Sequence, residues 1–423
     1  MNTNRIEYNQ SELLRFITCG SVDDGKSTLI GRLLHDSKSI FEDQLDAVEK
    51  STRRRGDDGV DLSLLTDGLQ AEREQGITID VAYRFFTTPK RKYIIADTPG
   101  HEQYTRNMAT GASTANLAVI LMDARKGVLD QSRRHAYIAN LLRIPHLLVA
   151  VNKMDLVNYS DQVFATICET FAEYAARLRF RDVIYIPISA LNGDMVVERG
   201  DHMPWYAGPT LLDLLENIEI DHDVNLEDFR FPVQWVCRPS STEYHDFRGY
   251  TGRIESGMVK AGDPITILPS GRSSRIKQIF TYDGPLGRAF APQSVTLLLE
   301  DDLDVSRGDM FVKNRDDVQV ANEFNADICW LSEQPLDMRR KYLVKHTAKT
   351  VKVWLTRLEY RVDVNASQLV GGLQSLQMND IARVGIKSQQ PLVIDSYARN
   401  RATGSFILID EANNNTVGAG MIV

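Results

Sequence analysis

The chain of 423 residues is too long for one hydrophobic core, so we expect two or three domains. Its composition, with 43% hydrophobic and 25% charged residues, is that of a globular protein and not of a disordered one. A formal net charge of −8 argues against a protein that coats itself in nucleic acid, and no apolar run reaches the roughly 18 residues of a membrane span. We therefore expect neither nucleic acid nor a membrane as a partner.

Apolar runs alternate with helical patterns through about the first 220 residues. The runs predict strands at residues 14–19, 81–87, 93–96, 117–122, 146–151 and 183–187. The segments between them predict helices at residues 26–35, 102–112, 131–142 and 162–178. This alternation indicates crossover connections and a mostly parallel sheet with both faces covered. A long polar insertion over residues 37–78, with a further helix predicted near residues 43–54, lies where a nucleotide-sensing switch would be.

Strand-like runs separated by turn signals follow from about residue 221. Those at residues 231–236, 263–268, 275–279 and 295–299 predict a small β-barrel or sandwich, and those at 351–357, 381–386, 390–394 and 404–409 predict a second all-β domain. The expected domain limits are 1–222, 223–318 and 319–423. Four scattered cysteines (Cys19, Cys168, Cys237 and Cys329) and a polar N-terminus predict reduced thiols in a cytoplasmic protein.

A glycine-rich segment follows the first predicted strand and opens the first predicted helix, which is the setting of a phosphate-binding loop. Its glycines let the backbone wrap a phosphate, so that N–H groups and the helix N-terminus face the anion. Lys26 would bridge the β- and γ-phosphates, and the Ser27 hydroxyl would bind Mg²⁺. The residues expected to contact nucleotide here are Gly20, Ser21, Val22, Asp23, Asp24, Gly25, Lys26, Ser27 and Thr28.

Two further segments are expected to sense the γ-phosphate. The first follows a strand and comprises Asp97, Thr98, Pro99, Gly100 and His101. Asp97 would hold a water on Mg²⁺, and the Gly100 N–H would contact the γ-phosphate. Thr78, after the polar insertion, would be a second protein ligand to the metal, so its segment would order with GTP and loosen with GDP. His101 would orient the attacking water, and the alternative is that it is an ordinary surface histidine. The predicted catalytic residues are therefore His101, Lys26 and Thr78.

Base recognition is predicted at the ends of two later strands. These residues are Asn152, Lys153, Met154 and Asp155, followed by Ser189, Ala190 and Leu191. Asp155 can accept hydrogen bonds from guanine N1–H and the 2-amino group, which adenine lacks, and such sites discriminate by roughly 10⁴–10⁵. Lys153 would lay its stem on the base, and Asn152 would tie this loop to the phosphate loop. The ordered set predicts GTP or GDP with Mg²⁺ as the ligands.

These segments, together with residues 67–80, strongly resemble the translational GTPase superfamily. Residues 252–262 look like the second-domain barrel of elongation factors, and residues 404–410 look like their third domain, so the resemblance covers the whole chain. It implies an α/β P-loop GTPase domain with a mostly parallel sheet, followed by two all-β barrel domains. It also implies that Val22 and Ile77 form an apolar gate beside His101, with simple packing as the alternative.

Within that superfamily the runs at residues 71–85 and 96–108 resemble those of the GTPase subunits of bacterial sulfate adenylyltransferases (ATP sulfurylases). Ser21 stands where elongation factors usually carry histidine, and Asp24 stands where bacterial elongation factors usually carry another histidine. Residues 245–250 stand where the second domain of elongation factors has a glycine-rich turn. The resemblance implies that GTP hydrolysis drives the synthesis of adenylylsulfate and diphosphate from ATP and sulfate by a smaller, catalytic partner subunit. The alternative is an elongation-factor-like carrier of aminoacyl-tRNA, which shares every GTP residue but not the departures just named.

Overall fold

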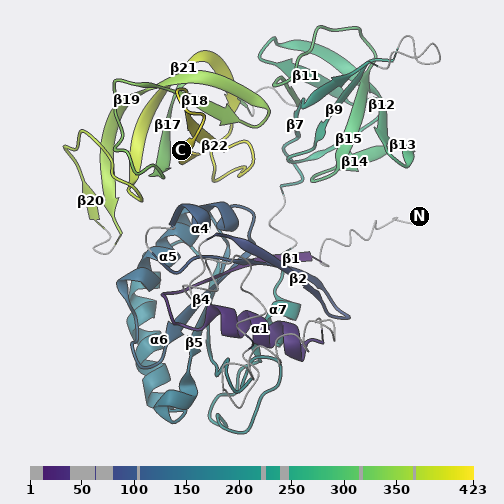
Figure 1. The fold of residues 1–423 in the computed structure, drawn as a ribbon. Coiled ribbons are helices and arrows are strands. Elements are labelled where there is room, and N and C mark those ends of the chain that lie inside the picture. The colour runs from purple at the N-terminus through teal and green to yellow at the C-terminus, as the bar shows by residue number, and fades with distance from the viewer. Residues whose placement is uncertain are drawn as a thin grey trace. The chain divides into compact units, whose positions relative to one another are not determined.

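The computed structural model describes residues 13–38, 62, 80–101, 105–220, 225–238, 247–313, 318–364 and 368–423. It divides into two compact units, Met1–Asp223 with Val364–Ala366, and Val224–Asp363 with Ser367–Val423. The first unit is α/β and the second holds two all-β domains (Figure 1), so the predicted fold class is confirmed. The limits at residues 222 and 318 stay a prediction.

The sheet of the first unit has the strand order β2-β3-β1-β4-β5-β6. Its strands are β1 (Leu13–Cys19), β2 (Ala82–Thr87), β3 (Lys92–Asp97), β4 (Leu117–Asp123), β5 (His146–Asn152) and β6 (Asp182–Pro187). Only β2 runs antiparallel to its neighbour, and the other pairs are parallel. Every residue of the central strands β4 and β5 is buried, which explains why both read as continuous apolar runs. Parallel order brings the carboxyl ends of β1, β3, β4, β5 and β6 to one edge.

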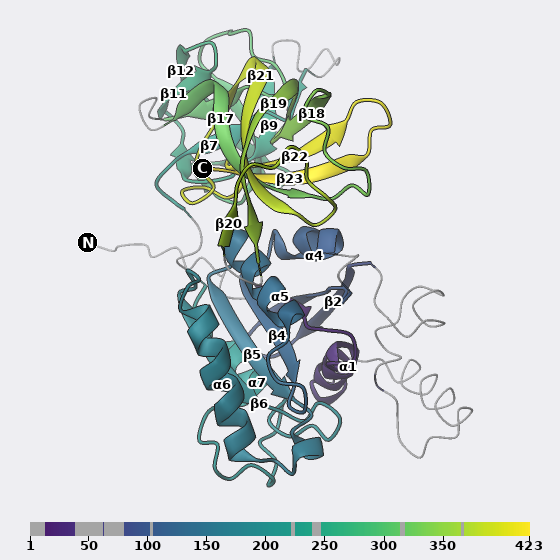
Figure 2. The same cartoon turned by 90° about the vertical axis from the view of Figure 1, so that its left-hand side faces the viewer.

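Helices cover both faces of this sheet. They are α1 (Lys26–Asp36), α4 (Thr105–Ala112), α5 (Asp130–Leu141), α6 (Asp161–Ala175) and α7 (Leu211–Asn217), with a short 3₁₀ helix, η4 (Met154–Val157). Figures 1 and 2 show α5 and α6 on one side of the strands and α1 and α7 on the other. The predicted helices are present, but α6 ends three residues early, and residues 102–104 and the predicted helix at 43–54 lie outside the described residues.

The first β-domain is a curled antiparallel sheet with the order β7-β16-β11-β12-β15-β9-β8, to which β13 adds on β12, beside a separate β10-β14 pair. Its strands are β7 (Arg230–Pro232), β8 (Trp235–Cys237), β9 (Gly249–Arg253), β10 (Met258–Lys260), β11 (Pro264–Leu268), β12 (Arg272–Thr281), β13 (Gly284–Leu286), β14 (Arg288–Phe290), β15 (Ser294–Leu299) and β16 (Met310–Val312). The predicted strand at residues 231–236 is wrong as one strand. Val233 N–H pairs with Asp309 whereas Gln234 N–H pairs with Thr251, so the chain changes neighbours between β7 and β8.

The second β-domain is a closed six-stranded barrel, because β18 pairs with β22 on one side and with β19 on the other. Its strands are β17 (Gln319–Trp330), β18 (Lys341–His346), β19 (Lys349–Asp363), β20 (Gln368–Val370), β21 (Ile381–Ile394), β22 (Ser405–Asp410) and β23 (Thr416–Ile422), with β20 as an extension on β19. Two strands predicted at 381–386 and 390–394 are one strand, β21. Among the described residues, no helix has the length and apolar character to cross a membrane.

A buried ion pair joins the two β-domains within the second unit. Arg230, only 1% exposed at its side chain, donates from Nε and Nη2 to the two carboxylate oxygens of Asp395 at 2.9 and 3.0 Å. Thr403 Oγ1 donates a third hydrogen bond to this carboxylate at 2.6 Å. Because each charge has its counter-ion and the Asp395 carboxylate accepts a further hydrogen bond, the pair can be buried away from solvent.

Arg230→Ala is expected to destabilise the second unit by about 3–5 kcal/mol, because it leaves Asp395 buried without its cation. Urea denaturation followed by fluorescence measures the change. Arg339→Ala is the matched control, since Arg339 pairs with Asp337 at the surface with 90% of its side chain exposed, and it should leave the midpoint unchanged. Equal midpoints for Arg230→Ala and the wild type would show that this pair does not hold the domains.

Candidate nucleotide-binding site

Only glycine fits at two points around the loop between β1 and α1, one within the loop and one in the segment that approaches it from β3. Gly25 has a φ of 92°, and a Cβ there would lie 2.5 Å from Nδ2 of Asn152. Gly100, from the end of β3, comes so close that a Cβ would lie 2.5 Å from Nζ of Lys26 and 2.7 Å from the Gly20 carbonyl oxygen. The loop, the following helix and the segment after β3 therefore meet at backbone distance, as a phosphate site requires.

Lys26 lies inside this loop with 7% of its surface exposed. Its Nζ donates to the carbonyl oxygens of Gly20 at 3.0 Å and Ser21 at 2.9 Å. Burial lowers the pKa of the Lys26 ammonium, and the nearby Asp97 and Asp24 carboxylates oppose that shift. The Lys26 ammonium, buried among backbone carbonyl groups, can form strong charge-assisted hydrogen bonds to phosphate oxygens.

Of the residues predicted to hold a metal, those that the structure describes lie at the same edge of the sheet. Asp97 is the last residue of β3 and is buried, and Thr18 Oγ1 donates to its Oδ1 at 3.1 Å. Ser27 and Thr28 stand in the first turn of α1 and are half-buried. His101 is exposed beyond the buried Thr98, Pro99 and Gly100. The predicted residues Ile77 and Thr78 lie outside the described part of the chain.

The residues predicted to recognise the base lie in two segments, 152–160 from the end of β5 and 189–195 after β6, which we call the base loops. The first contacts the phosphate loop, and the two contact each other. Asn152 Nδ2 donates to the Asp24 carbonyl oxygen at 2.8 Å, and Asn152 Oδ1 accepts from the Ala190 N–H at 2.9 Å. Ser189 Oγ donates to Oδ1 of Asp155 at 2.7 Å. Asn152 thus forms the tie between the loops that the sequence predicted, and Asp155 has one carboxylate oxygen fixed by its neighbour.

Three residues that support the site, Asp123, Arg125 and Arg32, were missed by the sequence analysis. Lys153 Nζ donates to the Asp23 carbonyl oxygen and lies 3.1 Å from Oδ2 of Asp123, at the end of β4. Arg125 adds two side-chain hydrogen bonds to Asp123, at 3.0 and 2.6 Å. Burial alone would raise the pKa of Asp123, but the hydrogen bonds from Arg125 and Lys153 outweigh it and hold that pKa well below its usual range. An acid directly after the buried run of β4 was the signal that could have identified it.

Arg32 on α1 is the third missed residue. Its Nε donates to the Ala190 carbonyl oxygen at 3.2 Å, and its Nη2 donates to that of Leu191, whose side chain is exposed. Helix α1 therefore supports both the phosphate loop and the loop after β6. No sequence spacing relates residue 32 to residue 190, so this contact is visible only in three dimensions.

Comparison with known proteins agrees with this geometry. Residues 11–220 match the family described as the elongation factor Tu GTP binding domain, and residues 323–423 match the GTP-eEF1A C-terminal domain-like family. A "Sulfate adenylyltransferase subunit 1" of Saccharophagus degradans is 54% identical over 99% of this chain and 88% of its own length. The chain belongs to the sulfate adenylyltransferase subunit 1 family. A "Bifunctional enzyme CysN/CysC" of Mycobacterium tuberculosis is 53% identical over 97% of this chain and 67% of its own.

Two phosphate-loop residues distinguish this subunit 1 family member from the elongation factors that it resembles, and they contact each other. The Ser21 N–H donates to Oδ2 of Asp24 at 2.6 Å. Burial raises the pKa of Asp24, and the hydrogen bond from Ser21 opposes that rise. Val22 between them is half-buried and Asp23 is exposed in a left-handed conformation with a φ of 68°. The Asp24 side chain thus stabilises the turn from Ser21 to Asp24 in the phosphate loop.

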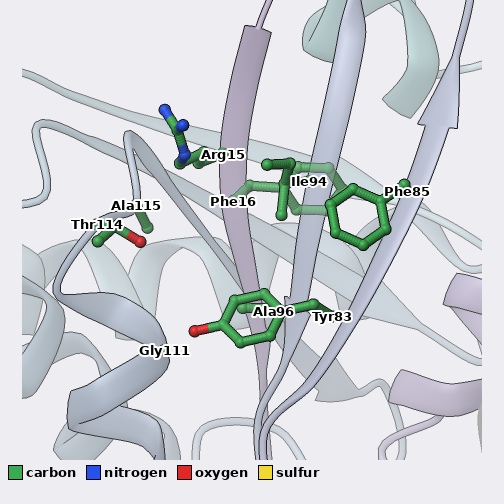
Figure 3. Close-up of a pocket in the computed structure, with 9 residues that line it drawn as sticks. All are labelled: Arg15, Phe16, Tyr83, Phe85, Ile94, Ala96, Gly111, Thr114 and Ala115. Atoms are coloured by element: carbon green, nitrogen blue, oxygen red, sulfur yellow. The ribbon is translucent and has the colours of Figure 1, made fainter. Parts of the chain in front are cut away.

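A separate cavity of about 260 Å³ lies in the first unit of this subunit 1 homologue, against β1, β2, β3 and the end of α4. Figure 3 shows the Phe85 ring of β2 beside Ile94 of β3 and the Tyr83 ring beside Ala96, the residues with which they pair. None of the site residues predicted from the sequence lines it. It is therefore distinct from the nucleotide-binding loops.

Proposed function

We propose that this chain binds and hydrolyses GTP as the GTPase subunit of a cytoplasmic sulfate adenylyltransferase. Its hydrolysis drives the synthesis of adenylylsulfate and diphosphate from ATP and sulfate, which a smaller catalytic subunit performs, as the first step of sulfate assimilation. The observation that carries the proposal is the 54% identity to a sulfate adenylyltransferase subunit 1 across 99% of the chain. The predicted guanine-nucleotide segments that the structure describes lie at one edge of the sheet and support it.

Three groups of residues hold the nucleotide in this proposal. The loop from Gly20 to Thr28 wraps the phosphates, with the Lys26 ammonium on the β- and γ-phosphates. Asn152 and Lys153 fix the base loop to the phosphate loop, and Asp155 reads guanine N1–H and the 2-amino group. A backbone N–H of the segment from Ser189 to Leu191 faces guanine O6 and completes the pocket, while the Ala190 N–H also donates to Asn152 Oδ1.

Mg²⁺ fits the donors that these residues present. Hydroxyl and carboxylate oxygens are the ligands that Mg²⁺ prefers, and Ser27 and Asp97 offer both types at the first turn of α1 and the end of β3. The hydrogen bond from Thr18 fixes one oxygen of Asp97. When bound with the nucleotide, the metal neutralises charge on the phosphate oxygens. Ser27 would hold the metal directly, Asp97 would hold it through a water, and Thr78 would be the second direct ligand.

The proposed hydrolytic step depends on His101 and Gly100. The Gly100 N–H contacts the γ-phosphate, which places the next residue, His101, beside the attacking water. The imidazole then orients or polarises that water. Val22 and Ile77 keep the histidine away from the water until the site is activated, so hydrolysis by the isolated chain is slow.

Coupling follows from the chemistry of the product. A sulfate–phosphate anhydride is very unfavourable to form, so a second, favourable reaction has to supply the driving force. The motifs identified in the sequence make up one set of nucleotide-binding segments, which is consistent with adenylyl transfer from ATP by the partner subunit. Thr78 reports the γ-phosphate, and a partner that contacts its segment would sense the difference between GTP and GDP.

Reconstitution with the second subunit tests the proposal. Phosphate release from GTP and diphosphate release from ATP are measured together. GTP should raise adenylylsulfate synthesis, and ATP with sulfate should accelerate GTP hydrolysis, whereas the isolated chain should hydrolyse GTP slowly and make no adenylylsulfate. Thr78→Ala should retain GDP binding but lose the coupling. Synthesis that is indifferent to GTP would contradict the proposal, and tight binding of charged tRNA would favour the elongation-factor alternative.

A further inference from the structure

Asp194 belongs to the base loop after β6 and contacts the base loop after β5. Its side chain is 7% exposed, and its carboxylate accepts hydrogen bonds at 2.9 Å from the Tyr159 hydroxyl and from Nδ1 of His202. Its backbone carbonyl oxygen accepts from the N–H of Ser189 at 3.1 Å. One buried acid therefore connects the loop after β5, through Tyr159, with the loop after β6, through Ser189. We call Asp194, Tyr159 and His202 the Asp194 cluster.

The base loops adopt backbone conformations that need such support. Lys153, Asn158, Tyr159 and Met195 all have positive φ, at 64°, 50°, 55° and 61°. Residues other than glycine rarely adopt this left-handed region, and they persist there where the surrounding structure determines them. Four residues in this conformation within the two base loops indicate that the backbone path of both loops depends on the contacts that hold them.

Tyr159 supplies several of those contacts. Its ring stacks on the His202 imidazole with centroids 4.6 Å apart and an interplanar angle of 7°. Its carbonyl oxygen accepts from Nε1 of Trp205 at 2.9 Å, and its hydroxyl accepts from Nδ2 of Asn192 at 3.0 Å while donating to Asp194. The hydroxyl thus has both a donor and an acceptor partner, each from the loop after β6.

The cluster is connected to the carboxylate predicted to read the base. The Asn192 N–H donates to Ser189 Oγ at 3.3 Å, and this same Oγ donates to Oδ1 of Asp155 at 2.7 Å. The Ser189 backbone is in turn held by Asp194. Displacement of the loop after β6 would therefore move the hydroxyl that fixes Asp155.

We propose that the Asp194 cluster positions the Asp155 carboxylate for guanine recognition. None of its three residues touches the base; they act by holding the two base loops together. Asp194 and Tyr159 are then positioning residues for base selectivity, which deepens the GTP-binding function proposed above and rests on it.

The charge on His202 makes this support dependent on pH. The hydrogen bond to Asp194 raises the pKa of His202 above its ordinary value of 6.5, with Asp194 and Asp201 as the acidic groups that face it and the Tyr159 ring on its flat side. The imidazolium–carboxylate pair is present below the raised pKa and is lost as pH rises through it. Base selectivity should fall over the same interval above pH 6.5.

Dissociation constants for GDP and inosine diphosphate test the proposal on the full chain. Inosine lacks the 2-amino group, so the ratio of the two constants reports the hydrogen bond to Asp155. Tyr159→Phe keeps the stacked ring but removes the hydroxyl, and it should reduce the guanine preference by roughly five- to tenfold. A purely structural loss would weaken both nucleotides equally and leave the ratio unchanged. Asp194→Asn should act in the same direction.

Tyr206→Phe is the matched control, because it removes a phenol from the same segment whose hydroxyl donates to the Tyr185 carbonyl oxygen at 3.1 Å. Its ratio should equal that of the wild type. His202→Gln should flatten the pH dependence of the ratio, since glutamine cannot titrate. An unchanged ratio in Tyr159→Phe would overturn the proposal alone, provided that Asp155→Asn loses the guanine preference. If Asp155→Asn keeps that preference, the GTP site itself is wrong.

Discussion

Asp155→Asn is expected to weaken GTP binding by up to roughly 10⁴ and to shift preference to xanthosine triphosphate. The carboxylate would lose its two hydrogen bonds from guanine, whereas the asparagine amide can donate to the carbonyl that xanthine carries at C2. Ser189 Oγ, which donates to Oδ1 of Asp155 at 2.7 Å, can still donate to an amide oxygen, so the loop should keep its shape. Competition of both triphosphates against a labelled GDP measures the change.

Asp161→Asn provides the control for charge. Asp161 is exposed at the start of α6, six residues along the chain from Asp155, and its Oδ1 accepts from the Gln162 N–H at 2.8 Å. The substitution removes the same charge without touching the proposed pocket, so nucleotide preference should match the wild type. Wild-type GTP affinity and selectivity in Asp155→Asn would mean that the base is read elsewhere.

His101→Ala is expected to lower GTP turnover by roughly 10²–10⁴ while nucleotide affinity stays within a few-fold, because the imidazole acts on the attacking water and not on the bound nucleotide. Lys26→Ala should behave in the opposite way and lose affinity, because its ammonium contacts the phosphates before any reaction. Single-turnover hydrolysis in the complex with the second subunit separates the two effects.

His35→Ala is the matched control for removal of an imidazole. His35 lies in the last turn of α1, and its Nδ1 pairs with Asp36 at 2.7 Å, away from the segment after β3. Turnover in this variant should equal that of the wild type. Should His101→Ala also equal the wild type with the partner present, His101 has no part in the mechanism.

The sequence predicted the strand–helix alternation of the first unit well, because β4 and β5 are long apolar runs with clear limits. Helix α7 was missed although Thr210 and Asp213 form a capping box at its N-terminus. Strand β21 was read as two strands because Lys387 to Gln390 are polar. They still belong to one strand, since Lys387 and Ser388 pair with Trp354 and Val353 of β19. Local polarity and pairing with a distant strand were in conflict, and the pairing prevailed.

The candidate site divides in the same way. The positions of motif residues such as Lys26, Asn152 and Asp155 could be predicted because each lies at a fixed place after a strand, whereas their chemical roles stay predictions. Arg32, Asp123 and Asp194 could not be predicted, because their partners are contributed by other elements and no spacing relates them. A supporting contact becomes visible only when the fold brings both partners together.

The closed ring of the second β-domain has a consequence for the order of folding during synthesis. Strand β23 (Thr416–Ile422) pairs with β17 on one side and β22 on the other, so one wall of the ring is missing until the last seven-residue strand is available. The pairing of Ala326 with Ile422 spans almost the whole domain. Contacts of such long sequence separation form late. The first unit can therefore fold on the ribosome while the barrel, and with it the partner of Arg230, waits until β23 has been synthesised.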